Sequence, residues 1–178
     1  RLVAFNRNSK QTIIYTYDPS SFVGGYLNVS KQQDQGFETE LRWSKGAFTL
    51  SGNYTFTTSK TTSPYDGTGA PIGKDSSYNN LYRIPKHAFN WKGSYVKNNW
   101  VFHLTGRMAS AREEFIYGAA PLTMPGYATL DLYGEYQFKH SGLRAFADLR
   151  NLTNTRYEEI RGYTTRGFNV LVGILIGR

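Results

Sequence analysis

Hydrophobic and polar residues alternate one by one along much of this chain. The alternation is most regular over three segments of about ten residues each: 48–57, 100–109 and 128–138. Successive side chains of a β-strand point to opposite faces, so this pattern predicts strands with one apolar and one polar face. Weaker alternation predicts three more strands, at 37–43, 89–95 and 143–150.

Each end of the chain predicts one further strand. Residues 2–17 alternate except at 8–10, where we expect a bulge or a local polar break, and residues 168–176 are apolar on both faces. The total is about eight strands and no helix. Ten residues is also the length that a tilted strand needs to cross a lipid bilayer.

The connections between these strands alternate in length. Tight turns are expected at 44–46, 97–99 and 139–142, and each is followed by a long loop. The long loops span about 58–85, 110–125 and 151–165. Short turns at one end and long loops at the other are typical of outer-membrane β-barrels.

Large aromatic residues lie on the apolar face beside every short turn. They are Trp43, Phe48, Tyr95, Trp100, Tyr136 and Phe138. Aromatic rings at one level form the interfacial girdle of a membrane barrel, where a ring sits half in lipid and half in water. The inner face of a soluble sandwich also uses aromatic residues, but three pairs in register with the turns favour the membrane interpretation.

The composition excludes several classes of site and partner. The 178 residues contain no cysteine, which excludes disulfides, thiolate metal sites and cysteine nucleophiles. The mean hydropathy of −0.51 is compatible with a membrane barrel, because alternating faces average to a polar value. The formal net charge is +8, from 21 Lys and Arg against 13 Asp and Glu. These cations are scattered along the chain, so we expect no nucleic-acid partner.

The polar face carries charged residues that would face the barrel lumen. Tight hairpins would place Gln137 near Arg144 and Asp131 near Arg150. Another would place Lys92 near His103 and Ala88 near Arg107. These groups either rigidify a wet barrel interior or hold a plug domain and guide a ligand.

Several segments resemble TonB-dependent outer-membrane receptors, particularly vitamin B12 and siderophore transporters. They are GYLNV (25–29), QGFETEL (35–41), LSGNYTF (50–56), RIPKHAFN (83–90), GYATLDLY (126–133), NLTNTRY (151–157) and GYTTRGF (162–168). They occur in the family's order across nearly the whole chain. Two departures are Asn151-Leu152-Thr153-Asn154, where the family commonly has Asn-Leu-Phe-Asp, and the end Ile176-Gly177-Arg178, where many such barrels end in an aromatic residue.

The resemblance implies an all-β, antiparallel transmembrane β-barrel segment, about eight strands of a 22-stranded barrel. Residues 1–178 would be the C-terminal portion of that barrel, with the plug domain and the earlier strands absent. The start at Arg1, within a predicted strand, fits this expectation.

The resemblance also implies the activity and the partners. The whole receptor would import a scarce large ligand, either a metal chelate (ferric siderophore or haem) or a corrinoid (cobalamin), energised by the TonB complex through the absent plug. The chain would lie in the bacterial outer membrane, in contact with lipopolysaccharide and other lipid. It would supply barrel wall and extracellular loops, with no enzymatic activity and no cofactor.

The long loops contain the candidate ligand-binding residues. Aromatic and arginine side chains commonly contact large ligands. The candidates are Tyr78, Tyr82, Arg112, Tyr117, Arg161 and Tyr163. Solvent-exposed loop decoration, or contact with anionic lipopolysaccharide, is the alternative role for such residues. No catalytic residue is expected, and the three histidines lack the spacing of a metal site.

Two other functions remain open from the residues alone. The first is a self-contained eight-stranded outer-membrane barrel that serves adhesion or structure, since eight is an even number and 178 residues suffice. The second is a soluble β-barrel or sandwich that binds a small ligand.

Overall fold

The computed structural model describes residues 1–18, 23–66, 70–79, 81–116, 119–139 and 141–177, with residues 14, 16–18, 27, 29 and 30 described by their backbone only. This part of the chain contains no helix, and hence none that could span a membrane. Its strands are β1 (Leu2–Asp18), β2 (Val23–Lys45), β3 (Phe48–Tyr65), β4 (Pro71–Tyr78), β5 (His87–Lys97), β6 (Trp100–Ala109), β7 (Arg112–Glu114), β8 (Leu122–Met124), β9 (Tyr127–Gln137), β10 (Leu143–Arg150), β11 (Glu158–Ile160), β12 (Tyr163–Thr164) and β13 (Asn169–Ile176).

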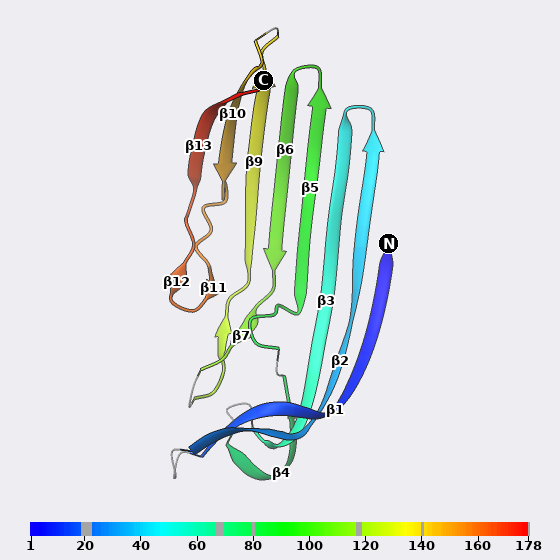
Figure 1. Cartoon of the computed structure of the whole chain (residues 1–178), viewed down its shortest axis with the longest axis vertical. Helices are drawn as coiled ribbons and strands as arrows, with labels where there is room; N and C mark the ends of the chain where they lie inside the picture. Colours follow the sequence, from blue (N-terminus) through cyan, green and yellow to red (C-terminus); the bar gives the residue numbers. More distant parts are fainter. Residues whose placement is uncertain (19–22, 67–69, 80, 117–118, 140, 178) are drawn as a thin grey trace.

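Eight long strands form one antiparallel sheet in the order β1-β2-β3-β5-β6-β9-β10-β13 (Figure 1). The predicted eight strands and the all-β class are therefore confirmed. The short strand β4 pairs with the end of β3. Two small hairpins, β7–β8 and β11–β12, lie within the long connections and were not predicted. Each of the eight long strands pairs with the next long strand along the chain, as in an up-and-down barrel wall.

The register separates the apolar and polar residues onto two faces. Phe37 pairs with Phe56, and Leu104 pairs with Leu132, on one face. Glu38 pairs with Thr55 on the other face. The alternation in sequence thus becomes one apolar and one polar surface from β2 to β10, whereas β13 is apolar on both faces.

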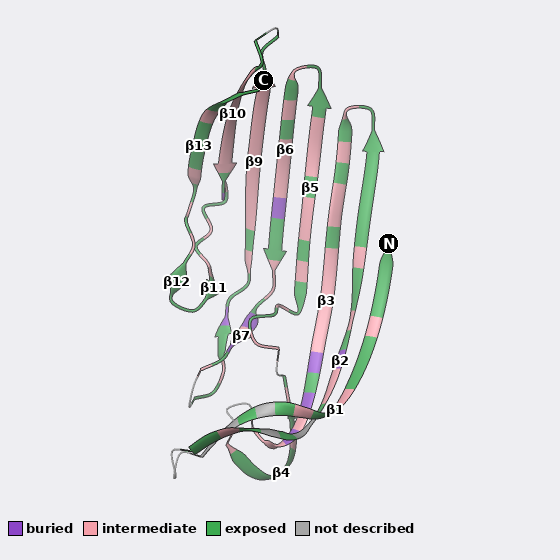
Figure 2. Cartoon of the chain, in the orientation of Figure 1, coloured by how far each residue is buried: buried purple, intermediate pink, exposed green. Residues whose placement is uncertain are grey.

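The apolar face is not covered by protein. Met124 is the only hydrophobic side chain buried among the described residues, whereas Leu41 is 66% and Trp43 is 51% exposed. Figure 2 shows the buried positions mostly at the long-loop ends of the strands and near β7. A soluble sandwich or closed soluble barrel would bury this face, so the fold does not support that alternative. Lipid is the environment that suits such a surface.

The turn between β5 and β6 contains two residues, one fewer than the predicted turn at 97–99. Lys97 pairs with Trp100, so the turn is Asn98–Asn99, with Asn98 in the left-handed region (φ 55°). His103 therefore lies opposite Ser94, and the predicted pairing of Lys92 with His103 was wrong by two residues. Arg107 likewise lies opposite Asn90 instead of Ala88. A shift of two keeps every side chain on its predicted face.

The second and third strands, β2 and β3, extend farther than predicted. β3 runs to Tyr65, although a loop was expected from about residue 58, and β2 begins at Val23. The bulge in β1 lies at Gln11 (φ 56°), next to the predicted polar break at residues 8–10. The extensions of β2 and β3 lie at the long-loop end of the sheet (Figure 1).

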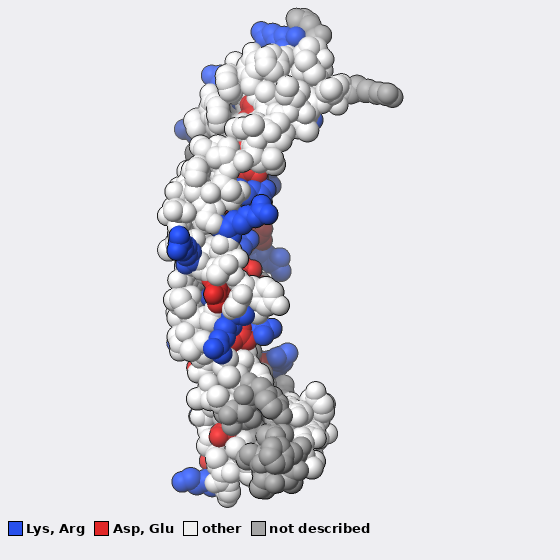
Figure 3. All heavy atoms as spheres, turned by 90° about the vertical axis from the view of Figure 1, so that its left-hand side faces the viewer, with Lys and Arg blue, Asp and Glu red and all other residues white. Residues whose placement is uncertain are grey.

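Charges of both signs share the polar face. Arg144 lies opposite Gln137, as predicted, and its guanidinium reaches Glu135 at 3.3 Å. Arg150 bonds Asp148 at 2.8 Å. Figure 3 shows acidic and basic side chains interspersed in a band along the sheet. Ion pairs within β10 and between β9 and β10 therefore stiffen this wet surface.

Candidate functional site

The three long connections, residues 66–86, 110–126 and 151–168, meet at one end of the sheet. Arg112 at the start of β7 joins the second to the third. Its guanidinium donates to the carbonyl oxygens of Pro125 and Glu158, and it lies 5.6 Å from the centre of the Tyr127 ring. The side chain is only 6% exposed. Arg112 thus holds two loops in place.

Glu114, at the end of β7, joins all three loops. Its carboxylate accepts a 2.8 Å hydrogen bond from Arg83 Nε and a 3.5 Å bond from the backbone N–H of Arg161. Arg83 has a left-handed backbone (φ 64°), and its N–H donates to the Glu113 carbonyl at 2.7 Å. Glu114 is 2% exposed. Burial alone would raise the pKa of Glu114, but the bonds from Arg83 and Arg161 lower it overall.

Replacing Glu114 with glutamine is expected to loosen the contact between the three loops. The neutral amide loses the ion pair with Arg83 and weakens the bond from the Arg161 N–H, at about 1–3 kcal/mol of local stability. Hydrogen exchange of the intact receptor in detergent should accelerate over residues 81–86 and 158–164. Glu113→Gln is the matched control, because the Glu113 side chain bonds only to Asn79 among the described hydrogen bonds.

The same carboxylate predicts a pH dependence. A carboxyl whose folded-state pKa is lowered stabilises the fold above its unfolded pKa, and this contribution disappears as the pH falls through the folded value. The loop contact should be constant between pH 7 and 5 and weaken only below the ordinary value of 4.5. The Glu114→Gln variant should lack this acid transition, and an equal transition in the variant would contradict the assignment.

The third loop folds back onto the polar face of the sheet. Arg107 of β6 pairs with Glu159 at 3.2 Å, and the Tyr127 hydroxyl donates to the same carboxylate at 3.1 Å. The Tyr127 and Tyr157 rings stack with their centres 4.0 Å apart. Because these partners lie on the polar face, the β11–β12 hairpin covers the long-loop end of that face.

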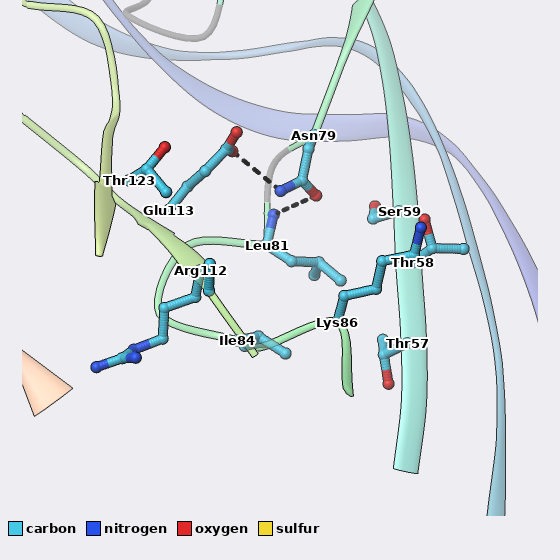
Figure 4. A pocket seen from close by; sticks show the side chains of 11 residues that line it. Thr57, Thr58, Ser59, Asn79, Leu81, Ile84, Lys86, Arg112, Glu113 and Thr123 are labelled. Carbon is cyan, nitrogen blue, oxygen red and sulfur yellow. Dashed lines mark hydrogen bonds between the residues drawn. The ribbon is translucent and has the colours of Figure 1, made fainter. Parts of the chain in front are cut away.

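A polar pocket of about 350 Å³ lies between β3 and the first two loops (Figure 4). Its lining includes hydroxyls of β3 together with Lys86, Asn79 and Glu113. Asn79 donates to Glu113 at 3.0 Å and accepts from the Leu81 N–H at 3.2 Å. Figure 4 shows the Arg112 side chain directed away from Lys86. The pocket offers hydroxyl and amide groups, the Lys86 ammonium and the Glu113 carboxylate to a bound molecule.

A second, more apolar recess of about 520 Å³ lies on the other side of the β7–β8 hairpin. Residues 122–125 form one wall, and the third loop contributes Arg156, Tyr157 and Thr164. Thr123 lines both recesses. The hairpin therefore divides one mouth into a polar and an apolar compartment, which suits a large ligand with both kinds of surface.

The structure places the predicted binding residues at this end of the sheet but not in one cluster. Of the five candidates that the structure describes, only Arg112 lines either recess. Tyr78 and Tyr82 are half-buried in the first loop, Arg161 is exposed, and Tyr163 is 74% exposed at the tip of the third loop. Tyr117 lies outside the described residues.

Tyr82 is held as a neutral phenol. Burial, with the nearby Tyr78, Glu113 and Asp66, raises its pKa to about 12. Its ring packs edge-on against Phe115 with the centres 5.5 Å apart. Near neutral pH, Tyr82 can act as a hydrogen-bond donor and an apolar contact but not as a phenolate.

Sequence reasoning missed Lys86 and Arg156, which line the recesses, and Glu114, which positions the loops. The adjacent pair Glu113–Glu114, directly after Arg112, was the available signal, because buried acids need nearby cations. Among the described residues, no group of three or more His, Asp or Glu side chains is arranged to hold a metal ion.

The sequence matches one protein family. The model of the β-barrel of TonB-dependent receptor-like proteins matches residues 1–152. The chain belongs to the TonB-dependent receptor family. No curated protein matches the chain significantly in sequence.

Solved TonB-dependent receptors share the fold. The ferric-catecholate import receptor Fiu of E. coli K12 is 17% identical, with a TM-score of 0.72 over 97% of this chain and 24% of Fiu. The siderophore receptor PiuA of Acinetobacter baumannii is 20% identical, with a TM-score of 0.73 over 97% of this chain and 25% of PiuA. The ferripyoverdine receptor of the Pseudomonas aeruginosa outer membrane is 14% identical, with a TM-score of 0.71 over 97% and 24%. The chain thus spans about a quarter of these structures.

Membership of the family orients the sheet. The wall lies in the bacterial outer membrane, with its apolar face toward lipid. Short turns of such barrels face the periplasm and long loops face the outside, so the mouth formed by the three loops is extracellular.

Proposed function

We propose that this chain forms barrel wall and ligand-contacting loops of an outer-membrane receptor that imports a ferric siderophore, energised through TonB. The observation that supports this most directly is the extracellular mouth, where interlocked loops enclose a polar and an apolar recess. Structures with this fold include receptors for ferric catecholates and ferripyoverdine. Haem and cobalamin are alternatives within the same class of large ligand.

The charge of the mouth favours an anionic chelate. Lys86 and Arg156 line the recesses, and Arg161 and Arg166 lie in the third loop. None of these four takes part in the ion pairs found among the described residues. The four acids of the second and third loops, in contrast, all accept hydrogen bonds, from Asn79, Arg83, Gly162 and Arg107. Cations without carboxylate partners attract oxygen-rich anions.

We further propose that residues 1–178 are the C-terminal portion of the barrel. The fraction of the solved receptors that the chain spans supports this division, as does the open sheet with β1 and β13 at its edges. A plug domain and the earlier strands would then be encoded upstream. A reading frame that encodes a signal peptide directly before Arg1 would instead favour the self-contained eight-stranded barrel.

The double variant Lys86→Gln/Arg156→Gln is expected to bind anionic ferric chelates about 10–100-fold more weakly, because each removed contact with an anion contributes about 1 kcal/mol or more. Titration of the purified receptor with anionic and neutral ferric chelates measures this change. Neutral chelates should be affected little. Lys74→Gln is the control, because Lys74 of β4 is exposed and lines neither recess. Equal losses for neutral and anionic chelates would contradict the proposal.

Energisation is tested separately from binding. Cells that carry the receptor should lose uptake of the labelled chelate when TonB is deleted, whereas binding to their surface should persist. Uptake that continues without TonB would overturn the proposed energy source but not the proposed ligand.

A further inference from the structure

Each short turn carries one lysine. They are Lys45, Lys97 and Lys139, and all three are exposed. Lys45 pairs with Phe48 and Lys97 pairs with Trp100, so both lie at positions that belong to the lipid-facing side of β2 and β5. In Figure 1 these turns lie at the upper end of the sheet.

No acid balances these lysines. Segments 41–52, 91–104 and 136–144 contain no Asp or Glu. None of the three lysines takes part in the ion pairs described above. On the polar face, in contrast, cations and acids alternate and pair. Part of the +8 net charge is therefore concentrated at the short-turn rim, where it faces the membrane interface.

Aromatic rings connect the two lysines on β2 and β5. The Phe48 and Tyr95 rings pack with their centres 4.7 Å apart, between the two lysine-bearing turns. β2 and β5 are two strand spacings apart, roughly 10 Å. Long lysine side chains extend along apolar surface toward water, so both ammonium groups can reach one headgroup in this zone.

An apolar recess of about 450 Å³ lies deeper on the same three strands. Its lining includes Leu41, Leu50, Gly52, Tyr54, Phe89 and Trp91. It is hollow because Gly52, which lies opposite both Leu41 and Trp91, has no side chain. Lys45 is four residues from Leu41 on the same face, or roughly 13 Å at about 3.3 Å per residue. Gly93, opposite Leu50, leaves the path between the lysines and the recess open.

We propose that this face binds one anionic glycerophospholipid of the periplasmic leaflet. Its phosphate lies between Lys45 and Lys97, its glycerol region lies against Phe48 and Tyr95, and one acyl chain occupies the recess beside Gly52. The spacing between the cations and the recess corresponds to the part of a phospholipid between its phosphate and the middle of its acyl chain. The site is on the opposite end and the opposite face of the sheet from the extracellular mouth, so it is independent of the imported ligand.

The test compares lipid retention by the intact receptor. The receptor is purified in detergent with an equimolar mixture of phosphatidylglycerol and phosphatidylcholine of identical acyl chains, and native mass spectrometry counts the lipids that remain bound. We expect wild type to retain phosphatidylglycerol preferentially. Lys45→Gln/Lys97→Gln should reduce that preference roughly tenfold at low salt, because each lysine near an anionic lipid surface contributes a several-fold gain. High salt should reduce the wild-type preference.

Two further variants make the test specific. Lys60→Gln/Lys74→Gln removes the same charge from exposed positions at the extracellular end and should keep the wild-type preference. Gly93→Leu keeps both lysines and puts a side chain in the path to the recess, where an added Cβ has its first neighbour at 3.8 Å and thus causes no clash. It should lower the number of bound phospholipids.

Three results would overturn the proposal. They are equal retention of the two lipids by wild type, an unchanged preference after loss of Lys45 and Lys97, and unchanged retention in Gly93→Leu. The gel mobility of unheated samples, which differs between folded and unfolded barrels, verifies that each variant is folded.

Discussion

Replacing Gly36 with valine is expected to be the most damaging single substitution in the wall. A Cβ at Gly36 would lie 2.2 Å from the backbone oxygen of Phe56 and 2.5 Å from the Phe5 ring. Phe5 can rotate away, but the oxygen belongs to β3 and moves only if β2 and β3 separate. Overpacking of this kind costs about 3 kcal/mol or more when the neighbour cannot yield. Urea unfolding of the receptor in lipid vesicles measures the loss.

Gly25→Val is the matched control on the same strand. An added Cβ at Gly25 meets no atom within 4 Å. Valine also has a higher strand propensity than glycine, so the control should be neutral or slightly stabilising. If both variants unfold at the same urea concentration, the close contact at Gly36 is not what stabilises this part of the sheet.

The contact at Gly36 belongs to a pattern in which aromatic rings cover glycines of the neighbouring strand. A Cβ added at Gly106 would lie 2.2 Å from the Trp91 ring, and one added at Gly173 would lie 2.7 Å from the Phe146 ring. Such pairs protect the glycine backbone and fix the register. The sequence shows the glycines and the rings, but their pairing depends on a register that the sequence does not specify.

The sequence predicted the wall well because the signal is local. Period-two alternation over segments such as 100–109 and 128–138 requires one lipid face and one polar face, and β6 and β9 agree with it. The alternation stops where a strand leaves the lipid, because neither face then needs to be apolar. Residues 58–65 are polar on both faces, so they read as a loop, yet β3 continues there because β2 and β4 supply backbone partners.

Residue type alone predicted the ligand-binding residues of the mouth, and it identified only part of the recess lining. Arginine and tyrosine in long loops indicate contacts with ligands or lipid, but they do not reveal which side chains the loops bury against one another. Arg112 is buried and bonds to carbonyl oxygens, and Glu114 joins three segments that are distant in sequence. Only the packing of the loops separates such positioning residues from those that line the recesses.

Asn151→Ala is expected to release the third loop while the wall stays folded. Asn151 has a left-handed backbone (φ 52°) and is 5% exposed. Its Nδ2 donates to the carbonyls of Thr155 and Arg166 at 2.9 and 3.0 Å, and its Oδ1 accepts from the Thr155 N–H at 3.0 Å. Alanine loses all three bonds and disfavours this backbone conformation, so the loop should lose about 3–5 kcal/mol of local stability.

Two further substitutions separate the effect of the lost side-chain bonds from the effect of the left-handed backbone. Asn151→Gly keeps the left-handed backbone but loses the side-chain bonds, so it should be less damaging than alanine by about 1 kcal/mol or more. Asn151→Asp keeps the acceptor for Thr155 but turns a second oxygen toward two carbonyls, so it should be at least as damaging as glycine. Hydrogen exchange over 151–168 measures all three variants, and equal protection in wild type and Asn151→Ala would refute the assigned role.

The Asn151 variants also connect the loop to the ligand. The Arg166 carbonyl that Asn151 holds is flanked by Thr165 and Gly167, which line the apolar recess. Release of the loop should therefore weaken ligand binding while the urea midpoint of the barrel stays unchanged, because no strand pair of the wall includes residues 151–168. Gly36→Val should do the reverse, lowering the urea midpoint first. Parallel losses in both variants would mean that loop and wall unfold as one unit, contrary to the structure, in which the strand ladder of the wall continues without residues 151–168.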